Sequence, residues 1–284
     1  MERFYRFADI TFRITGKDCE MYLEDGILAP FRVTEQQWDH SISFEIVEQL
    51  PAPEGECVFQ GNGIRVFRKE DVQITCVGTS GDAHTQILRQ GNRTYVQVHR
   101  SQVPERIMPR LVLNTLEAEH HIVGRGGFLL HSSFIRVGNR AILFTAPSGT
   151  GKSTQAELWR RYRGAEIING DRTAVMPTKE AVMAYGIPYC GTSGITGNAK
   201  LPVAAIVVLS QARKNRIEPL KGLRAFRNLW EGCSVHVWDK EDVEQCSQSV
   251  TEVLSRVPVV HLACTPDETA VEALEAYLNL KKEG

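Results

Sequence analysis

The sequence predicts an α/β fold preceded by a β-rich region, and three observations support this fold class. A short apolar run, a glycine-rich loop and a helix-forming segment follow one another over residues 141–162. The rest of the second half alternates apolar runs with helical segments, which is typical of α/β domains. Residues 1–100 instead hold β-branched and aromatic runs separated by turn signals. We therefore expect a β-rich accessory region at 1–103 and an α/β domain at 104–284, which begins with a linker helix at 104–123.

The accessory region is predicted to form an antiparallel sheet. Its turn signals include Gly61-Asn62-Gly63 and Gln90-Gly91-Asn92. The predicted strands lie at 4–14, 42–47, 63–68, 72–77 and 94–99. The linker helix is predicted from an apolar face, and Pro109 is expected to kink its first turn.

The second half begins with a predicted hairpin, in which strands 129–137 and 141–145 flank Gly138-Asn139-Arg140. A helix at 154–162 follows and stops before Arg163-Gly164. We expect its arginines on an exposed face: Arg160, Arg161 and Arg163. Further strands are predicted at 166–168, 174–176, 182–185, 204–209 and 259–263, and further helices at 241–256 and 267–280.

The most specific motif is Ala146-Pro147-Ser148-Gly149-Thr150-Gly151-Lys152-Ser153. It fits the phosphate-binding P-loop pattern G-x-x-x-x-G-K-[ST], except that Ala146 replaces the first glycine. The glycines let backbone N–H groups converge on phosphate oxygens, Lys152 adds a positive charge, and Ser153 offers a hydroxyl to Mg²⁺. The alternative is a chance glycine-rich turn. The expected nucleotide-binding residues are Ser148, Gly149, Thr150, Gly151, Lys152, Ser153 and Thr154.

Composition and charge exclude several classes of protein. The chain has 284 residues, a net charge of −1 and 42% hydrophobic residues, which are ordinary values for a globular protein. We therefore expect no nucleic-acid partner and no membrane partner. The N-terminus lacks a signal-peptide core. The seven cysteines are scattered without C-x-x-C spacing, so we expect free thiols, no structural zinc and a cytoplasmic location.

A phosphate site of this kind needs a carboxylate to hold its metal ion, and Asp171 is the candidate. A helix and a returning strand fit between Lys152 and Asp171, so the carboxylate is expected at the same edge of the sheet. There it can hold Mg²⁺ or accept a proton. The alternative is an ordinary turn aspartate, with Asn169-Gly170 making the turn.

His131 lies on the strand before the loop strand, where hairpin pairing can bring it beside the phosphates. It could then orient Asp171 or share a proton with it, although a histidine in a strand is more often structural. The expected catalytic residues are Asp171, His131 and Lys152, and the expected metal ligands are Ser153 and Asp171.

Two further segments offer weaker candidates. The loop Tyr189-Cys190-Gly191-Thr192-Ser193-Gly194 could bind a substrate, and Cys190 could act as a nucleophile, but no partner base is identifiable for it. The basic run Arg213-Lys214-Asn215-Arg216 could reach phosphates. A flexible loop and a solvated charge run are the respective alternatives.

In these residues the second half resembles the HPr kinase/phosphorylase catalytic domain and, more distantly, ATP-dependent phosphoenolpyruvate carboxykinase. The matching order is Leu130-His131, the glycine-rich motif, and then residues 163–171 (RGAEIINGD). The resemblance covers roughly residues 127–209. It implies a P-loop kinase-like domain of this type at 104–284, ATP or GTP with Mg²⁺ as cofactors, and the roles given above for His131, Lys152, Ser153 and Asp171.

The chain departs from that family in two respects. The family carries a pair of aspartates, but here either Gly170 stands in place of the first or Arg172 in place of the second, so one carboxylate is missing. The N-terminal third does not resemble the usual HPr kinase N-terminal domain. The chain is therefore more similar to divergent HPr-kinase-like proteins, which are associated with peptide modification clusters, than to the usual HPr kinases.

The sequence thus predicts a nucleotide- and Mg²⁺-dependent kinase that acts on a hydroxyl of a protein, peptide or small molecule. A P-loop ATPase is an alternative, but the apolar strand 204–209 ends in Ser210-Gln211 rather than an acidic residue. The second alternative is a nucleotide-binding module without catalysis, which the missing carboxylate favours.

Overall fold

The computed structural model describes residues 2–17, 20–21, 27–34, 37–78, 83–102, 106–107 and 109–279. The chain divides into two compact units, Met1–Ala118 and Glu119–Gly284. The boundary falls inside the segment for which a linker helix is predicted. The architecture is mixed α/β with large sheets, in agreement with the predicted fold class at this coarse level.

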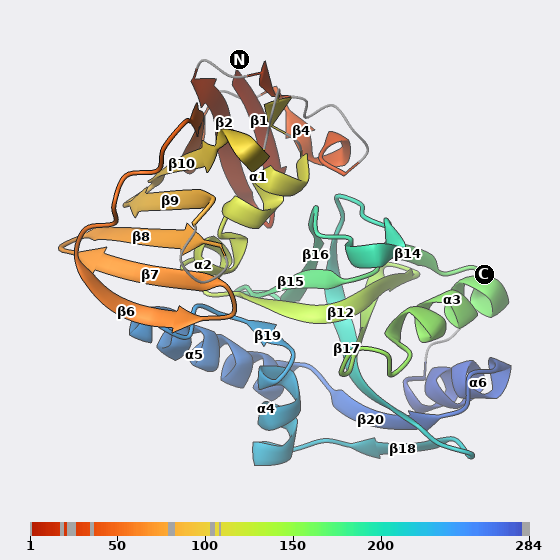
Figure 1. Ribbon diagram of the computed structural model, residues 1–284. Helices are drawn as coiled ribbons and strands as arrows, with labels where there is room; N and C mark the ends of the chain where they lie inside the picture. Colours follow the sequence, from red (N-terminus) through yellow and green to blue (C-terminus); the bar gives the residue numbers. More distant parts are fainter. Residues whose placement is uncertain are drawn as a thin grey trace. The chain divides into compact units, whose positions relative to one another are not determined.

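The first unit is built on a nine-stranded sheet in the order β4-β1-β2-β5-β10-β9-β8-β7-β6 (Figure 1). A short pair, β3 (Glu20–Met21) and β11 (Arg106–Ile107), lies outside it. The strands of the large sheet are β1 (Glu2–Phe7), β2 (Ile10–Lys17), β4 (Arg32–Val33), β5 (His40–Val47), β6 (Glu56–Gly61), β7 (Ile64–Lys69), β8 (Val72–Val77), β9 (Thr85–Gln90) and β10 (Arg93–His99).

Two predictions for this unit are wrong. The expected strand at 4–14 is two strands, because Ala8 and Asp9 both adopt a positive φ, of 51° and 56°, and turn the chain between β1 and β2. The sheet is also not wholly antiparallel, since β5 pairs in parallel with both β2 and β10. Alternation along one strand indicates which face is buried but not the direction of its neighbour.

The predicted single helix at 104–123 is wrong as well. The structure has two helices, α1 (Pro109–Thr115) and α2 (Ala118–Val123). Between them Glu117 has a φ of 47°, a conformation that ends a right-handed helix. Its buried carboxylate accepts a hydrogen bond from Arg89 Nε at 3.0 Å. Pro109 begins α1, where its missing N–H has no helical partner to lose.

The second unit is built on another nine-stranded sheet, of mixed strand direction, in the order β13-β12-β15-β16-β17-β20-β18, with β14 and β19 also paired to β12. Of these elements, α4, β18 and β19 are not predicted from the sequence. The strands are β12 (Phe128–Val137), β13 (Arg140–Thr145), β14 (Glu166–Asn169), β15 (Arg172–Pro177), β16 (Val182–Gly186), β17 (Lys200–Gln211), β18 (Arg216–Pro219), β19 (Cys233–Ser234) and β20 (Val259–Cys264). The remaining helices are α3 (Lys152–Arg163), α4 (Gly222–Trp230), α5 (Lys240–Arg256) and α6 (Glu268–Tyr277).

Different helices cover the two faces of this sheet (Figure 1). On one face Phe144 of β13 packs in a cluster with Trp159 of α3 and Val271 of α6. On the other, Leu143 packs in a cluster with Leu229 of α4 and Val250 of α5. Neighbouring residues of a strand point to opposite faces, so an unbroken apolar run such as 141–144 is what a strand buried on both sides requires.

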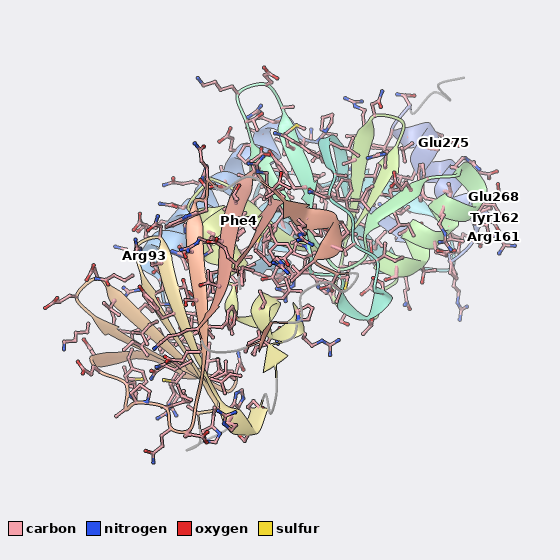
Figure 2. All side chains as sticks on the ribbon, turned by 90° about the horizontal axis from the view of Figure 1, so that it is seen from above. Phe4, Arg93, Arg161, Tyr162, Glu268 and Glu275 are labelled. Carbon is pink, nitrogen blue, oxygen red and sulfur yellow. The ribbon has the colours of Figure 1, made fainter. Side chains whose placement is uncertain are left out.

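Helices α3 and α6 are joined by ion pairs at their surface edge. Arg163 donates to Glu275 at 2.8 Å and to Glu268 at 3.3 Å, and Figure 2 shows both glutamates beside the end of α3. Only 17% of the Arg163 side chain is exposed. The expectation that Arg163 lies on the exposed face is therefore wrong, whereas Arg160 and Arg161 are exposed.

The sheet also determines where the functional elements meet. Strand β13 runs parallel to β17, with Thr145 opposite Val208, so both strands end at the same edge. The glycine-rich segment follows β13 directly, and α3 begins at Lys152. Within the described part of the chain, no helix combines the length and apolar character needed to cross a bilayer.

Candidate active site

The glycine-rich loop (residues 146–151) connects β13 to α3, in the strand, loop and helix order predicted from the sequence. Gly149 and Gly151 have φ values of 78° and 122°, which glycine adopts without strain and other residues rarely do. The loop ends at the N-terminus of α3, where free backbone N–H groups and the helix dipole favour an anion. These features are compatible with the phosphate-binding role predicted from the sequence, which stays a prediction.

Lys152 is held against this loop. The residue is 7% exposed, and its Nζ donates to the carbonyl oxygens of Ala146 at 2.9 Å and Pro147 at 3.4 Å. Burial lowers the pKa of Lys152, while the charge of Asp171 acts to raise it. The ammonium group thus contacts the loop and interacts electrostatically with the candidate metal-binding carboxylate.

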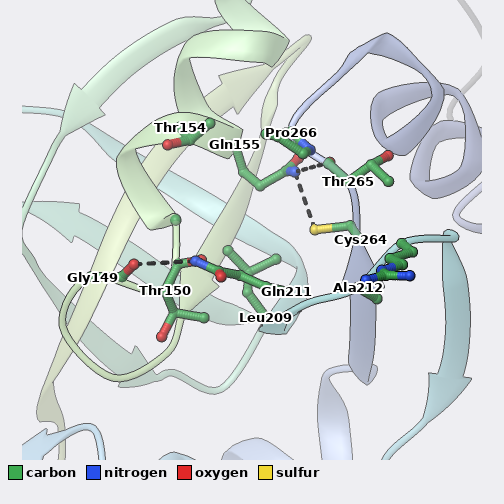
Figure 3. Close-up of a pocket in the computed structure, with 12 residues that line it drawn as sticks. Gly149, Thr150, Thr154, Gln155, Leu209, Gln211, Ala212, Cys264, Thr265 and Pro266 are labelled. Carbon is green, nitrogen blue, oxygen red and sulfur yellow. Dashed lines mark hydrogen bonds between the residues drawn. The ribbon is translucent and has the colours of Figure 1, made fainter.

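A cavity of about 490 Å³ opens beside the loop (Figure 3). Its walls come from residues 149–151, from Thr154 and Gln155 of α3, and from the ends of β17 and β20. The volume lies in the range of small-molecule sites. Leu209, Ala212 and Pro266 give it apolar surface, so the cavity can take a partly apolar ligand group beside the glycine-rich loop.

Two glutamines line the cavity and make hydrogen bonds within its wall. Neither is among the site residues predicted from the sequence. Gln211 Nε2 donates to the carbonyl oxygens of Gly149 and Thr150, both at 3.4 Å. Gln155 Nε2 donates to Cys264 Sγ at 3.2 Å. The Oε1 atom of Gln155 is buried and has no hydrogen-bond partner among the described residues. A buried acceptor of this kind is costly unless a ligand or water satisfies it.

Asp171 and His131 form a hydrogen-bonded pair. Strands β12 and β15 are antiparallel with His131 opposite Arg172, which brings His131 Nε2 to 3.4 Å from Asp171 Oδ1. The bond with His131, with a further contribution from Arg172, lowers the pKa of Asp171 and outweighs the burial that would raise it. Asp171 is therefore a carboxylate at neutral pH, the form that can ligate a cation or orient an imidazole.

Asn169 positions this carboxylate. Its fully buried side chain accepts from the backbone N–H groups of Asp171 at 2.8 Å and Arg172 at 3.0 Å. Its Nδ2 donates to the carbonyl oxygen of Ile187 at 2.7 Å. An asparagine that bonds the backbone two residues ahead makes a turn. The sequence indicated the turn, but not that it braces a site residue.

The loop at 189–194 packs against Asp171. A Cβ on Gly191, whose φ is +55°, would lie 2.8 Å from Asp171 Cγ. The Arg172 guanidinium lies over the Tyr189 ring at 5.5 Å. Cys190 is 7% exposed, so its thiol is poorly placed for a nucleophile.

Of the basic run at 213–216, Arg213 lines the cavity, whereas Arg216 pairs with Glu218 at 3.4 Å.

The predicted site residues thus fall into two groups. Gly149, Thr150, Gly151 and Thr154 line the cavity. Lys152, Ser153, His131 and Asp171 are not among its lining residues. Ser148 and Ser153 are exposed, the first within the loop and the second in the first turn of α3. Lys152 connects the groups, since it contacts the loop and interacts with the charge of Asp171.

Comparisons with known proteins do not assign the chain to a family. No family model matches it, and no curated protein matches it. Among solved structures it is similar to the Hpr(Ser) kinase/phosphatase from Coxiella burnetii, with a TM-score of 0.32 and 16% sequence identity, over 55% of this chain and 99% of that chain. A likeness of this size does not by itself establish a shared activity.

Proposed function

We propose that the protein is a nucleotide- and Mg²⁺-dependent phosphotransferase that acts on a hydroxyl group of a protein, peptide or small molecule. The observation that carries the proposal is the glycine-rich loop, which has a buried lysine folded against it and a cavity of about 490 Å³ beside it. In this proposal the cavity takes the base and sugar of ATP or GTP. The loop N–H groups and Lys152 take the phosphates.

The residues present fit a bound Mg²⁺. Asp171 is held as a carboxylate by its neighbours. Ser153 lies in the first turn of α3, the position that the Mg²⁺-binding hydroxyl has in P-loop proteins. Oxygen ligands of these two kinds are those that Mg²⁺ prefers. A bound Mg²⁺ would neutralise charge on the phosphates during transfer.

The His131–Asp171 pair is the proposed acceptor of the hydroxyl proton. The acceptor oxygen forms a bond to the terminal phosphorus while the bond to the bridging oxygen breaks, and the nucleoside diphosphate leaves. The proton of the hydroxyl passes to the imidazole of His131, since histidine is the commonest general base in proteins, while Asp171 stays ionised. Asp171 then stabilises the imidazolium that forms.

The second candidate is a nucleotide-binding module without catalysis. One specific observation favours it: Arg172 Nε lies 3.7 Å from Asp171 Oδ2, where one alignment with the carboxykinase pattern expects a second carboxylate. A guanidinium group cannot ligate Mg²⁺. The phosphate and metal chemistry would then lack one of its acidic groups.

An assay with γ-phosphate-labelled ATP, Mg²⁺ and a panel of hydroxyl acceptors tests the proposal. Label on an acceptor supports the phosphotransferase. Free phosphate alone indicates an ATPase, and calorimetric binding of Mg-ATP without turnover indicates the binding module. An absence of both turnover and binding overturns all three.

Lys152→Ala is the first variant to measure. We expect it to lower the transfer rate roughly 100-fold or more, the scale of losing one group that stabilises transition-state charge. Lys179→Ala is the matched control, because Lys179 is an exposed lysine of the same unit, and it should keep the wild-type rate. Full transfer activity in Lys152→Ala would contradict the assignment.

A further inference from the structure

Three side chains of the second unit form a compact cluster that the proposed phosphotransfer does not use. His120 lies on α2, His236 follows β19, and Asp242 lies in the first turn of α5. One metal-ligating atom from each lies within 4.8 Å of the others. The three residues are far apart in the sequence, so only the fold brings them together.

The distances within this cluster suit a single small cation. His120 Nδ1 is hydrogen-bonded to the Asp242 carboxylate, 2.8 Å from Oδ1 and 2.9 Å from Oδ2. His236 Nδ1 is 3.6 Å from Asp242 Oδ2. A tetrahedral zinc ion with bonds of about 2.0–2.1 Å separates its ligand atoms by roughly 3.3 Å. Both rings therefore present the same nitrogen to one carboxylate, at close to the spacing that zinc requires.

The surroundings of His236 add a second feature of metal sites. Its other nitrogen, Nε2, lies 3.3 Å from Glu119 Oε1. Histidines that bind metals usually donate their second N–H to a carboxylate, which leaves the lone pair of the first nitrogen free for the ion. Glu119 is thus an outer carboxylate that selects the tautomer in which Nδ1 can bind.

The cluster is held in place before any ion binds. His236 stacks on Trp238 with ring centroids 4.6 Å apart and on His120 at 5.9 Å. Asp239 caps α5 by accepting from the N–H groups of Glu241 and Asp242. The Asp242 side chain is 4% exposed, and a buried carboxylate is stable only when positive charge compensates it.

We propose that His120, His236 and Asp242 bind one Zn²⁺ ion, with Glu119 orienting His236 from the outer layer. Three protein ligands leave a fourth position for water, and the His120 side chain, 24% exposed, gives access from solvent. The lack of paired cysteine motifs does not bear on this site, because its donors are two imidazoles and a carboxylate.

The ion would tie α2 to the segment that connects β19 with α5. Strand β19, at which that segment begins, lies beside the candidate active site: Gly232, the residue before β19, accepts a hydrogen bond from the backbone N–H of His131 at 2.8 Å. The zinc site would therefore brace the end of β19, the strand next to the proposed His131–Asp171 pair. It does not depend on the proposed function, since its ligands are separate from the loop, Lys152 and Asp171.

The test is titration of the chelator-treated full-length protein with Zn²⁺ alone, followed by calorimetry. We expect one equivalent to bind. Asp242→Asn and His236→Asn should abolish this binding, and Glu119→Gln should weaken it roughly 10- to 100-fold while keeping the stoichiometry. His261→Asn is the matched control, because His261 pairs with Ser210 and Glu218 in the same unit and lies outside the cluster. It should bind as the wild type does.

Substitution by Co²⁺ keeps the proposal testable if a ligand variant fails to fold. Cys233 and Cys246 form a hydrogen-bonded thiol pair, and Cys246 lies one turn after Asp242, so thiolate ligation is the competing arrangement. The wild-type protein with Co²⁺ should show tetrahedral visible absorption without a thiolate charge-transfer band. A thiolate band, no stoichiometric Zn²⁺ binding, or unchanged affinity in folded Asp242→Asn would each overturn the proposal.

Discussion

At the scale of residues, the candidate active site depends on polar side chains that hold one another in defined states. His131 and Arg172 keep Asp171 ionised, and Asn169 fixes the backbone on which Asp171 sits. Gln155 and Gln211 hold the cavity wall and the loop. Each contact joins residues that neighbouring strands bring together. The chemistry of Asp171 therefore follows from its neighbours more than from its own side chain.

The lowered pKa of Asp171 predicts a pH-dependent contribution to stability. Because the pKa of Asp171 is lower in the folded state, its ionised form stabilises the fold at pH values above the ordinary pKa of 3.8. This contribution is lost as the pH falls from 3.8 through the lowered pKa. We therefore expect Asp171→Asn to unfold at a lower temperature than the wild type at pH 6–7. The difference should shrink as pH falls below about 4.

Thermal unfolding measured across this pH range checks the prediction. Glu180→Gln changes an exposed carboxylate of the same unit and should follow the wild type throughout. A difference between Asp171→Asn and the wild type that stays constant from pH 7 to pH 3 would show that the Asp171 charge is not stabilised in the fold.

At the scale of elements, loops and helix edges position the site. The loop at 189–194 packs its backbone against Asp171 at Gly191, while α3 is fastened to α6 by Arg163. These contacts connect elements that are not adjacent in the chain. For each contact, two matched substitutions can separate its contribution to the free energy of unfolding from the local cost of changing the residue.

Gly191→Ala and Gly194→Ala form the first such pair. Both glycines have positive φ, 55° and 68°, so either alanine is strained by about 1 kcal/mol or more. Only at Gly191 would the new Cβ meet Asp171, at 2.8 Å from Cγ, whereas Gly194 has no neighbour within 4 Å among the described residues. We expect Gly191→Ala to be the less stable variant in denaturant unfolding. Equal losses would mean that the loop yields without displacing Asp171.

Arg163→Ala and Arg160→Ala form the second pair. Arg163 is largely covered and bonds two glutamates of α6, so its loss should lower the free energy of unfolding by about 1–2 kcal/mol. Arg160 is 58% exposed and pairs with Glu157 one turn away, so its loss should cost no more than about 0.5 kcal/mol. Urea denaturation of both variants measures the difference, and a larger loss for Arg160→Ala would refute the role given to Arg163.

At the scale of the whole molecule, each unit has its own sheet, and the second unit is closed by helices on both faces. The unbroken apolar character of 141–144 and 204–209 predicts strands buried on both sides. The hairpin, the helix after the loop, and the helices near 241–256 and 267–280 are observed close to their predicted positions. The roles assigned to Ser153, Asp171 and His131 toward nucleotide and Mg²⁺ stay predictions.

What the sequence by itself determined is local: the strand, glycine-rich loop and helix around Lys152, the apolar strands, and the turn before Asp171. These depend on backbone preferences and hydrophobic periods, which neighbouring residues encode. Only the tertiary structure decided the parallel pairing of β5, the break at Glu117, the bracing of Asp171 by Asn169, and the meeting of His120, His236 and Asp242. Those features require contacts between segments distant in the chain, and no pattern of neighbouring residues specifies such contacts.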